Sequence, residues 1–97
     1  MMERLDLERG LTQRSAHIFR DAEGDFTEDT VNNRQQLINT AVNEENYLGM
    51  DKWGNDWYAK SLANGQQIWV QIRKGEIING RINSSSRRWF RSTGLIQ

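Results

Sequence analysis

The sequence predicts an α+β domain, in which one or two N-terminal helices pack on one face of an antiparallel β-meander of three to five strands. Three observations support this class. Residues 67–73 alternate strictly between apolar and other side chains, which is the period of a β-strand. Glycine-containing turns flank this run at 64–65 and 74–76, as expected between antiparallel neighbours. Residues 31–45 instead place apolar side chains at helical spacing.

Helices are expected in the first half of the chain. Residues 1–10 are charged and end in a glycine, so they either form a short helix or remain frayed. Small and apolar side chains recur at helical spacing over 11–22, which predicts a short helix that carries His17. The helix over about 31–45 can be capped by Thr30. Its apolar stripe should cover the sheet and consists of Leu37, Ile38, Ala41 and Val42.

The second half reads as the meander. A first short strand is predicted at 47–52, and the sequence DKWGND at 51–56 is expected to form a turn. Three strands then follow within 57–83. A serine-rich loop at 84–88 leads to a short last strand at 89–96.

The turn at Asn64-Gly65 sets a register for the first of the two hairpins. Asn-Gly suits a two-residue type I′ turn, because both central residues need a positive φ. The resulting pairs are Trp57–Ile72, Tyr58–Gln71, Ala59–Val70 and Lys60–Trp69. This register places Trp57 on the apolar face of the sheet, and Tyr58 and Lys60 on the other face.

The second turn, at 74–76, fits a three-residue loop with Gly75 in the left-handed region. The resulting pairs are Arg73–Ile77, Ile72–Ile78 and Ile68–Ile82. A slip of one residue would exchange the two faces. The second face, expected to be open, then carries Tyr58, Lys60, Trp69, Gln71, Arg73, Ile77, Asn79, Arg81 and Asn83.

Composition limits the classes of function. Ninety-seven residues allow one domain, 1–97, in which 1–15 could be a frayed N-terminal extension. It has no cysteine and one histidine, so disulfides, thiolate chemistry and most zinc sites are not expected, nor is any cofactor. We expect no membrane partner and a cytoplasmic location, since the chain has neither a long apolar run nor a signal peptide.

Charge is zero overall but unevenly distributed. Residues 1–50 hold five Arg and ten Asp or Glu, a net charge of −5, and residues 51–97 hold eight Lys or Arg and three Asp or Glu, a net charge of +5. The second half could therefore bind an anionic partner, or the two halves could simply attract each other within the fold.

The second face and His17 together suggest chemistry on RNA. Metal-independent cleavage needs a base, an acid and cations that stabilise the phosphate. His17 suits proton transfer near neutral pH, and Lys60, Arg73 and Arg81 could hold phosphate. Further candidate RNA contacts, by stacking, hydrogen bonding or charge, are Tyr58, Trp69, Gln71, Asn79, Arg87 and Arg88.

Each candidate also has a structural alternative. A histidine beside Ile18 and Phe19 is often structural, and exposed arginines on a sheet are often only solvated. Tyr58 and Trp69 could be cross-strand packing partners of Lys60. Trp53 and Trp57 are expected in the core.

Several strings resemble a known group of domains. They are HIFRDAEGDFTEDT at 17–30, NRQQL at 33–37, the whole of 47–83 and a closing TGL at 93–95. Over 16–96 the chain resembles the C-terminal toxin domains of bacterial polymorphic toxins and prophage proteins, which we associate with the barnase–EndoU–colicin–RelE group of metal-independent ribonucleases. The most specific strings are GNDWYAK, GQQIWVQIR and INGRIN.

This resemblance implies helices followed by a four-stranded meander, cleavage of RNA (often tRNA) and a cognate immunity protein as partner. It implies an active site of His17, Lys60, Arg73 and Thr93, with the Thr93 hydroxyl donating to phosphate. Two residues depart from the pattern: Asp25 stands where the family has histidine, and Arg81 where it has glycine.

Three hypotheses follow. The first is a toxin-like, metal-independent ribonuclease, in which Lys60 or Tyr58 would replace the missing second histidine as the acid. The second is a non-catalytic, prophage- or toxin-derived module that docks a protein or an RNA. The third is a dimer formed face to face through the sheet, which would bury Trp69.

Overall fold

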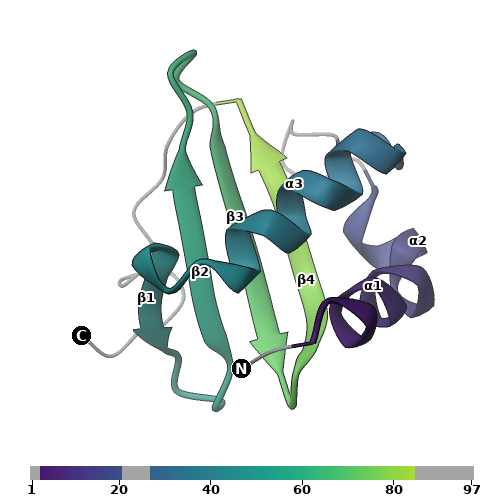
Figure 1. Cartoon of the computed structure of the whole chain (residues 1–97), viewed down its shortest axis with the longest axis vertical. Coiled ribbons are helices and arrows are strands. Elements are labelled where there is room, and N and C mark those ends of the chain that lie inside the picture. The colour runs from purple at the N-terminus through teal and green to yellow at the C-terminus, as the bar shows by residue number, and fades with distance from the viewer. Residues whose placement is uncertain (1–2, 21–26, 85–97) are drawn as a thin grey trace.

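The computed structural model describes residues 3–20 and 27–84 of the 97-residue chain. The elements, in order, are α1 (Arg4–Gln13), α2 (Ser15–Ile18), α3 (Val31–Val42), a 3₁₀ turn (Glu44–Asn46), β1 (Tyr47–Met50), β2 (Asp56–Ser61), β3 (Gln67–Arg73) and β4 (Glu76–Asn83). The strands form one antiparallel sheet in the order β1-β2-β3-β4. Helix α3 crosses one face of this sheet, and α1 and α2 lie beside β4 (Figure 1). The predicted α+β class is confirmed.

Helix α1 begins earlier than expected and passes through Gly10 without a break. Leu7 and Leu11, one helical turn apart, are both fully buried against the sheet. A Cβ at Gly10 would lie 2.8 Å from both the N and the O of Ile77, so only glycine lets the helix approach β4 this closely. Helix α1 therefore packs on the sheet and contributes Leu7 and Leu11 to the core, and the expected helix over 11–22 is wrong in its bounds.

Helix α3 is capped as predicted. The Thr30 hydroxyl accepts a hydrogen bond from the backbone N of Asn33 at 3.0 Å. Leu37, Ile38 and Ala41 are buried, as expected for the apolar stripe, whereas Val42 is partly exposed. The core between helices and sheet consists of Leu7, Leu11, Ile18, Leu37, Ile38, Ala41, Tyr58, Ile68, Val70, Ile72 and Ile77.

The predicted register of the first hairpin is wrong by one residue. Ser61 pairs with Gln67, and the backbone N of Leu62 donates to Gln66 O at 2.8 Å, which leaves a three-residue loop at 63–65. Only Gly65 of this loop has a positive φ, +88°, whereas a type I′ turn would need two such residues. The slip reverses the facing of every β2 side chain. The observed pairs are Trp57–Gln71, Tyr58–Val70, Ala59–Trp69 and Lys60–Ile68.

The second hairpin is partly as predicted. Ile68 does pair with Ile82, but the turn has two residues, Lys74 and Gly75, both with positive φ. The register shifts between Gln71–Asn79 and Ile72–Ile77, so Ile78 is the extra residue of a β-bulge. As a result Ile77, and not Ile78, is fully buried in the core.

The second face of the sheet is not open at its centre. The rings of Trp57 and Trp69 are stacked with centroids 5.2 Å apart, and the residues are only 6% and 8% exposed. Leu48 and Ala59 pack against them. The reversal of β2 explains this second cluster, because it moves Trp57 to the face that carries Trp69. No helix in the described ranges is long and apolar enough to cross a membrane.

Candidate functional site

The residues predicted to be catalytic lie apart from one another. His17 is exposed on α2, beside β4, whereas Lys60 is exposed on β2 and projects on the helix side of the sheet. Arg73 lies at the opposite end of β3 from Ile68, the partner of Lys60, so strand geometry separates the two cations by roughly 17 Å. Thr93 lies outside the described residues. The structure thus brings none of these three described groups together.

The aromatic side chains predicted to stack on RNA are buried. Tyr58 belongs to the core under the helices and contacts the Tyr47 ring, with centroids 5.2 Å apart. Burial first, and then the charges of Glu44 and Asp56, raise the pKa of Tyr58 to about 12, so its hydroxyl stays protonated near neutral pH. Trp69 is held in the second cluster and donates from Nε1 to Asn83 at 3.3 Å.

The polar groups predicted on the same face are also engaged within the fold. Gln71 donates to the carboxylate of Asp51 at 3.1 Å, and Asn79 accepts from the backbone N of Gly80. Arg81 is buried, and its guanidinium donates to the Ile18 carbonyl at 3.5 Å. Arg87 and Arg88 lie outside the described residues.

A buried carboxylate organises the turn between β1 and β2. Asp51 is 2% exposed; its Oδ1 accepts from the backbone N of Trp53 and of Asn55, both at 2.9 Å. Its Oδ2 accepts from Trp57 Nε1 at 2.8 Å, from Gln71 Nε2 at 3.1 Å and from Asn55 Nδ2 at 3.2 Å. Burial, the largest single influence, raises the pKa of Asp51, but these donors together outweigh it and the pKa is lowered. The carboxylate is therefore ionised and fixes the turn.

This turn presents Trp53 to solvent. Trp53 is 58% exposed, in contrast to the expected core position. Arg73 donates to its carbonyl at 2.7 Å, and Lys52 Nζ lies 4.5 Å from the centroid of its ring. Lys74 is exposed in the neighbouring β3–β4 turn, at the same end of the sheet (Figure 1). We call Lys52, Trp53, Arg73 and Lys74 the Trp53 cluster.

The carboxylates near the Trp53 cluster have partners of their own. Asp56 accepts from the hydroxyl of Tyr47 at 2.8 Å. Glu76 lies 3.4 Å from Arg9 and 3.2 Å from Arg14, in two ion pairs. The cluster therefore combines one exposed aromatic ring with three cations, of which Lys52 and Lys74 lie in the two turns and Arg73 at the end of β3. The described residues include no group of three or more side chains suited to hold a metal ion.

Sequence reasoning found Arg73 but missed the residue beside it. Tryptophan is usually buried, so the sequence predicts Trp53 in the core. The flanking sequence contains the signal that Trp53 is exposed to solvent. Asp51 and Asn55 are typical of a tight turn, and such a turn directs the residues between them outward.

Comparison with known proteins identifies no relative of this chain: no family model, no curated protein and no solved structure matches it.

Proposed function

We propose that this protein is a non-catalytic module that binds single-stranded RNA at the Trp53 cluster. The observation that carries the proposal is an exposed tryptophan held on a preorganised turn between cations. Five hydrogen bonds to Asp51 fix the turn and connect it to Trp57 and Gln71. Ligand binding would therefore require little further loss of backbone entropy.

The chemistry of the cluster matches unpaired nucleotides. An exposed aromatic ring stacks on any base, which contributes about 1–3 kcal/mol per base. Lys52, Arg73 and Lys74 supply positive charge for neighbouring phosphates. A double helix offers no exposed base face at its centre, so the cluster should prefer single strands, loops or ends.

Binding is favoured over cleavage by the positions of the proton-transfer groups. His17 lies beside β4 and Lys60 near the far end of β3, away from the cluster. Tyr58, the other candidate acid, is buried in the core with a raised pKa. The ribonuclease activity and the immunity protein implied by the resemblance to toxin domains remain predictions.

The test is fluorescence anisotropy with a labelled single-stranded RNA of about 12 nucleotides, in excess chelator. Trp53→Ala should weaken binding about tenfold, the loss expected from one stacked base. Removing Arg73 and Lys74 together should also reduce the slope of log affinity against log salt, by about 0.7 for each phosphate that is no longer neutralised. Arg20→Ala, which removes an exposed cation next to α2, is the matched control. Equal affinity of all variants, or site-specific cleavage of the RNA, contradicts the proposal.

A further inference from the structure

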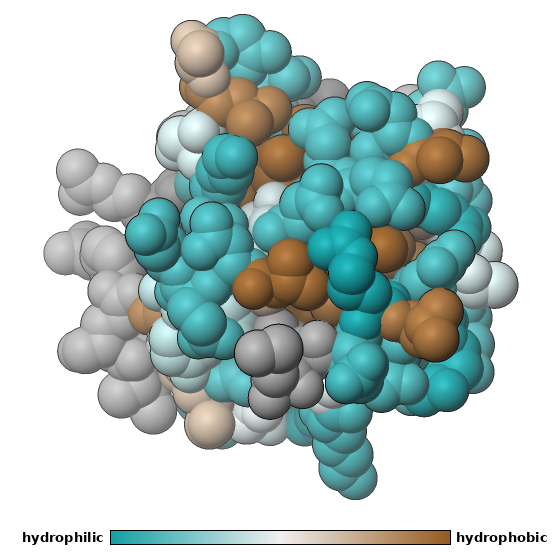
Figure 2. Space-filling view, in the orientation of Figure 1, coloured by the Kyte–Doolittle hydropathy of each residue, from teal (hydrophilic) through white to brown (hydrophobic). Residues whose placement is uncertain are grey.

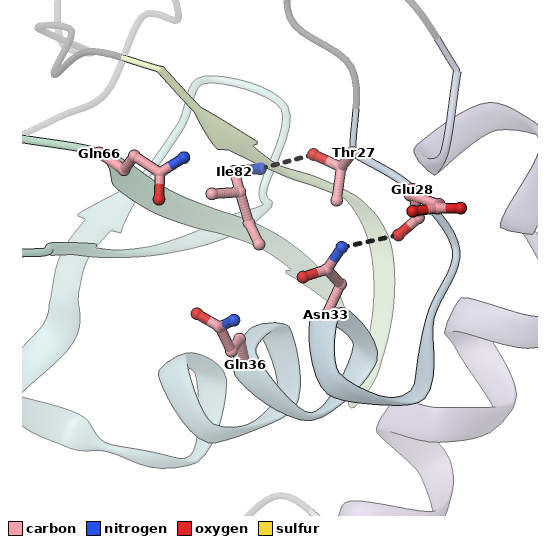
Figure 3. Close-up of a pocket in the computed structure, with 6 residues that line it drawn as sticks. All are labelled: Thr27, Glu28, Asn33, Gln36, Gln66 and Ile82. Carbon is pink, nitrogen blue, oxygen red and sulfur yellow. Dashed lines mark hydrogen bonds between the residues drawn. The ribbon is translucent and has the colours of Figure 1, made fainter. Parts of the chain in front are cut away.

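Two hollows of about 350 and 120 Å³ lie beside α3 on the helix side of the sheet, away from the Trp53 cluster. Gln36 lines both of them, and we call the two hollows together the groove. Figure 3 shows the larger hollow between α3, the start of β3, the end of β4 and the segment that leads into α3. Its floor includes Ile82, whose backbone N donates to the Thr27 hydroxyl at 2.9 Å.

Side-chain amides are the most frequent kind of described lining residue in the groove. Described lining residues of this kind are Asn33, Gln36, Asn39, Asn43, Asn46 and Gln66. Asparagine is a poor helix former, and Glu or Lys would solvate a helix face at lower cost. Amides also occur on α3 away from the groove, at Asn32 and Gln35, so the lining amides are distinguished by their position at the hollows.

Some of these amides support the fold and others do not. Asn39 accepts from Arg4 at 2.7 Å, and Asn46 donates to the Thr40 carbonyl. Gln36, by contrast, makes no side-chain hydrogen bond within the described residues. Gln66 accepts from Asn64 through Oε1, and Asn33 donates to the Glu28 carbonyl through Nδ2. The Nε2 of Gln66, the Oδ1 of Asn33 and the whole Gln36 amide thus offer both donors and acceptors to a ligand.

The net charge of the groove favours a peptide over RNA as its ligand. Its described lining residues include one acid, Glu28, and one base, Lys60, so their charges cancel. An RNA strand would place phosphates against a nearly neutral wall, which gives little counterion release. A peptide main chain is uncharged and carries one donor and one acceptor per residue. These groups can pair with the side-chain amides of the groove. Figure 2 shows hydrophilic residues over most of this side, with hydrophobic residues only in separate groups.

The length of the groove also suits a peptide. Asn33 and Asn43 lie ten residues apart along α3, which is about 15 Å at the helical rise. An extended chain covers that distance with four or five residues, at about 3.3 Å each. The floor of Leu62, Ile68 and Ile82 could accept small apolar side chains between the main-chain contacts.

We propose that this groove binds an extended, uncharged segment of a protein partner, whose main chain forms hydrogen bonds with the Gln36 amide, the Gln66 Nε2 and the Asn33 Oδ1. The proposal is independent of RNA binding, because it uses other residues on another part of the molecule.

The test is selection from a displayed library of random heptapeptides on the whole protein, followed by affinity measurements with the enriched peptides. Peptides rich in uncharged residues should bind. Gln36→Ala should weaken them about tenfold, as expected for the loss of one or two hydrogen bonds, and Gln36→Arg, which fills the groove, should weaken them further. Asn32→Ala removes an exposed amide of α3 that does not line the groove and should leave affinity unchanged. Trp53→Ala should also have no effect.

Three results would overturn this inference. The first is that no peptide is enriched above background. The second is that the enriched peptides bind the Gln36 variants and the wild type equally. The third is that Gln36→Arg weakens binding of the labelled single-stranded RNA, which would assign the groove to nucleic acid. Near-ultraviolet circular dichroism of each variant shows whether the fold is retained, and Asn33→Ala provides a second groove variant if Gln36→Arg does not fold.

Discussion

Replacement of Asp51 by Asn tests whether a buried charge holds the functional turn. Asparagine keeps the size of the side chain and one acceptor oxygen, which can still serve the backbone N of Trp53 and of Asn55. The second oxygen becomes an NH₂ group that faces three donors, from Trp57, Asn55 and Gln71. The two side-chain amides can turn their oxygens toward it, but the Trp57 Nε1 can only donate.

The magnitude follows from these contacts. A buried donor without a partner costs about 1–3 kcal/mol, and a hydrogen bond to a charged group contributes about 1.5–3 kcal/mol. Part of the loss is recovered when the amides turn, so we expect Asp51→Asn to lower the free energy of unfolding by about 3 kcal/mol. A domain of this size is typically stable by about 5–15 kcal/mol, so the variant should still fold.

Urea denaturation followed by tryptophan fluorescence measures this loss. Asp56→Asn is the matched control, because Asp56 is a less buried carboxylate at the start of β2, and within the described residues its side chain has one hydrogen bond, from Tyr47. It should cost below about 1 kcal/mol. If the two substitutions cost the same, the buried carboxylate does not organise the turn.

The pH dependence gives a second readout of Asp51. Its pKa in the folded protein is lowered from the ordinary value of 3.8. A lowered pKa means that the ionised group stabilises the fold above pH 3.8, and that this stability is lost as the pH falls through the folded-state value. The wild type should therefore lose stability in this acid range, and Asp51→Asn should lack that part of the loss. Identical acid profiles would contradict the assignment.

Other substitutions test the fold and the exposure of the site. Gly10→Ala should destabilise the protein by about 2 kcal/mol despite a better helix propensity, because the new Cβ meets the Ile77 backbone. A gain in melting temperature would show that α1 does not lie that close to β4. Thr30→Ala should cost about 1 kcal/mol in urea denaturation, and Thr30→Ser should restore it, unless the cap does not form. Trp57→Ala should cost about 3–5 kcal/mol, whereas Trp53→Ala should change stability by less than about 0.5 kcal/mol. Equal losses for the two tryptophans would place Trp53 in the core.

The fold class and α3 were predictable because their signals are local. The Thr30 cap and the apolar stripe lie within one helix, and the strict alternation over 67–73 identifies β3 without any tertiary contact. The pairing of Ile68 with Ile82 was also predicted, since both residues need the same buried face.

The register of β2 was not predictable from its turn. Asn64-Gly65 fits both a two-residue and a three-residue loop, which differ in the φ of one residue. Tertiary contacts favour the three-residue loop, because its register stacks Trp57 on Trp69 and directs the Trp57 Nε1 to Asp51. The left-handed conformation of Lys74 was not predictable either, because lysine rarely adopts a positive φ.

The candidate site was predictable only in part. Arg73 was singled out as a phosphate contact, but the resemblance placed it in an active site with His17 and Lys60, which the structure does not bring near it. The exposure of Trp53 depends on five hydrogen bonds to one carboxylate, some from residues distant in sequence. The spacing of residues along the sequence does not show that five donors meet at one carboxylate.

The most direct test of RNA binding at the Trp53 cluster is the affinity of the wild type and Trp53→Ala for a labelled single-stranded RNA and for its duplex, in the presence of chelator. We expect the wild type to bind the single strand about tenfold more tightly than Trp53→Ala does, with little difference on the duplex and no cleavage of either. Equal binding of the single strand by both proteins would contradict an RNA site at the Trp53 cluster. Cleavage that disappears in His17→Ala would instead support a ribonuclease.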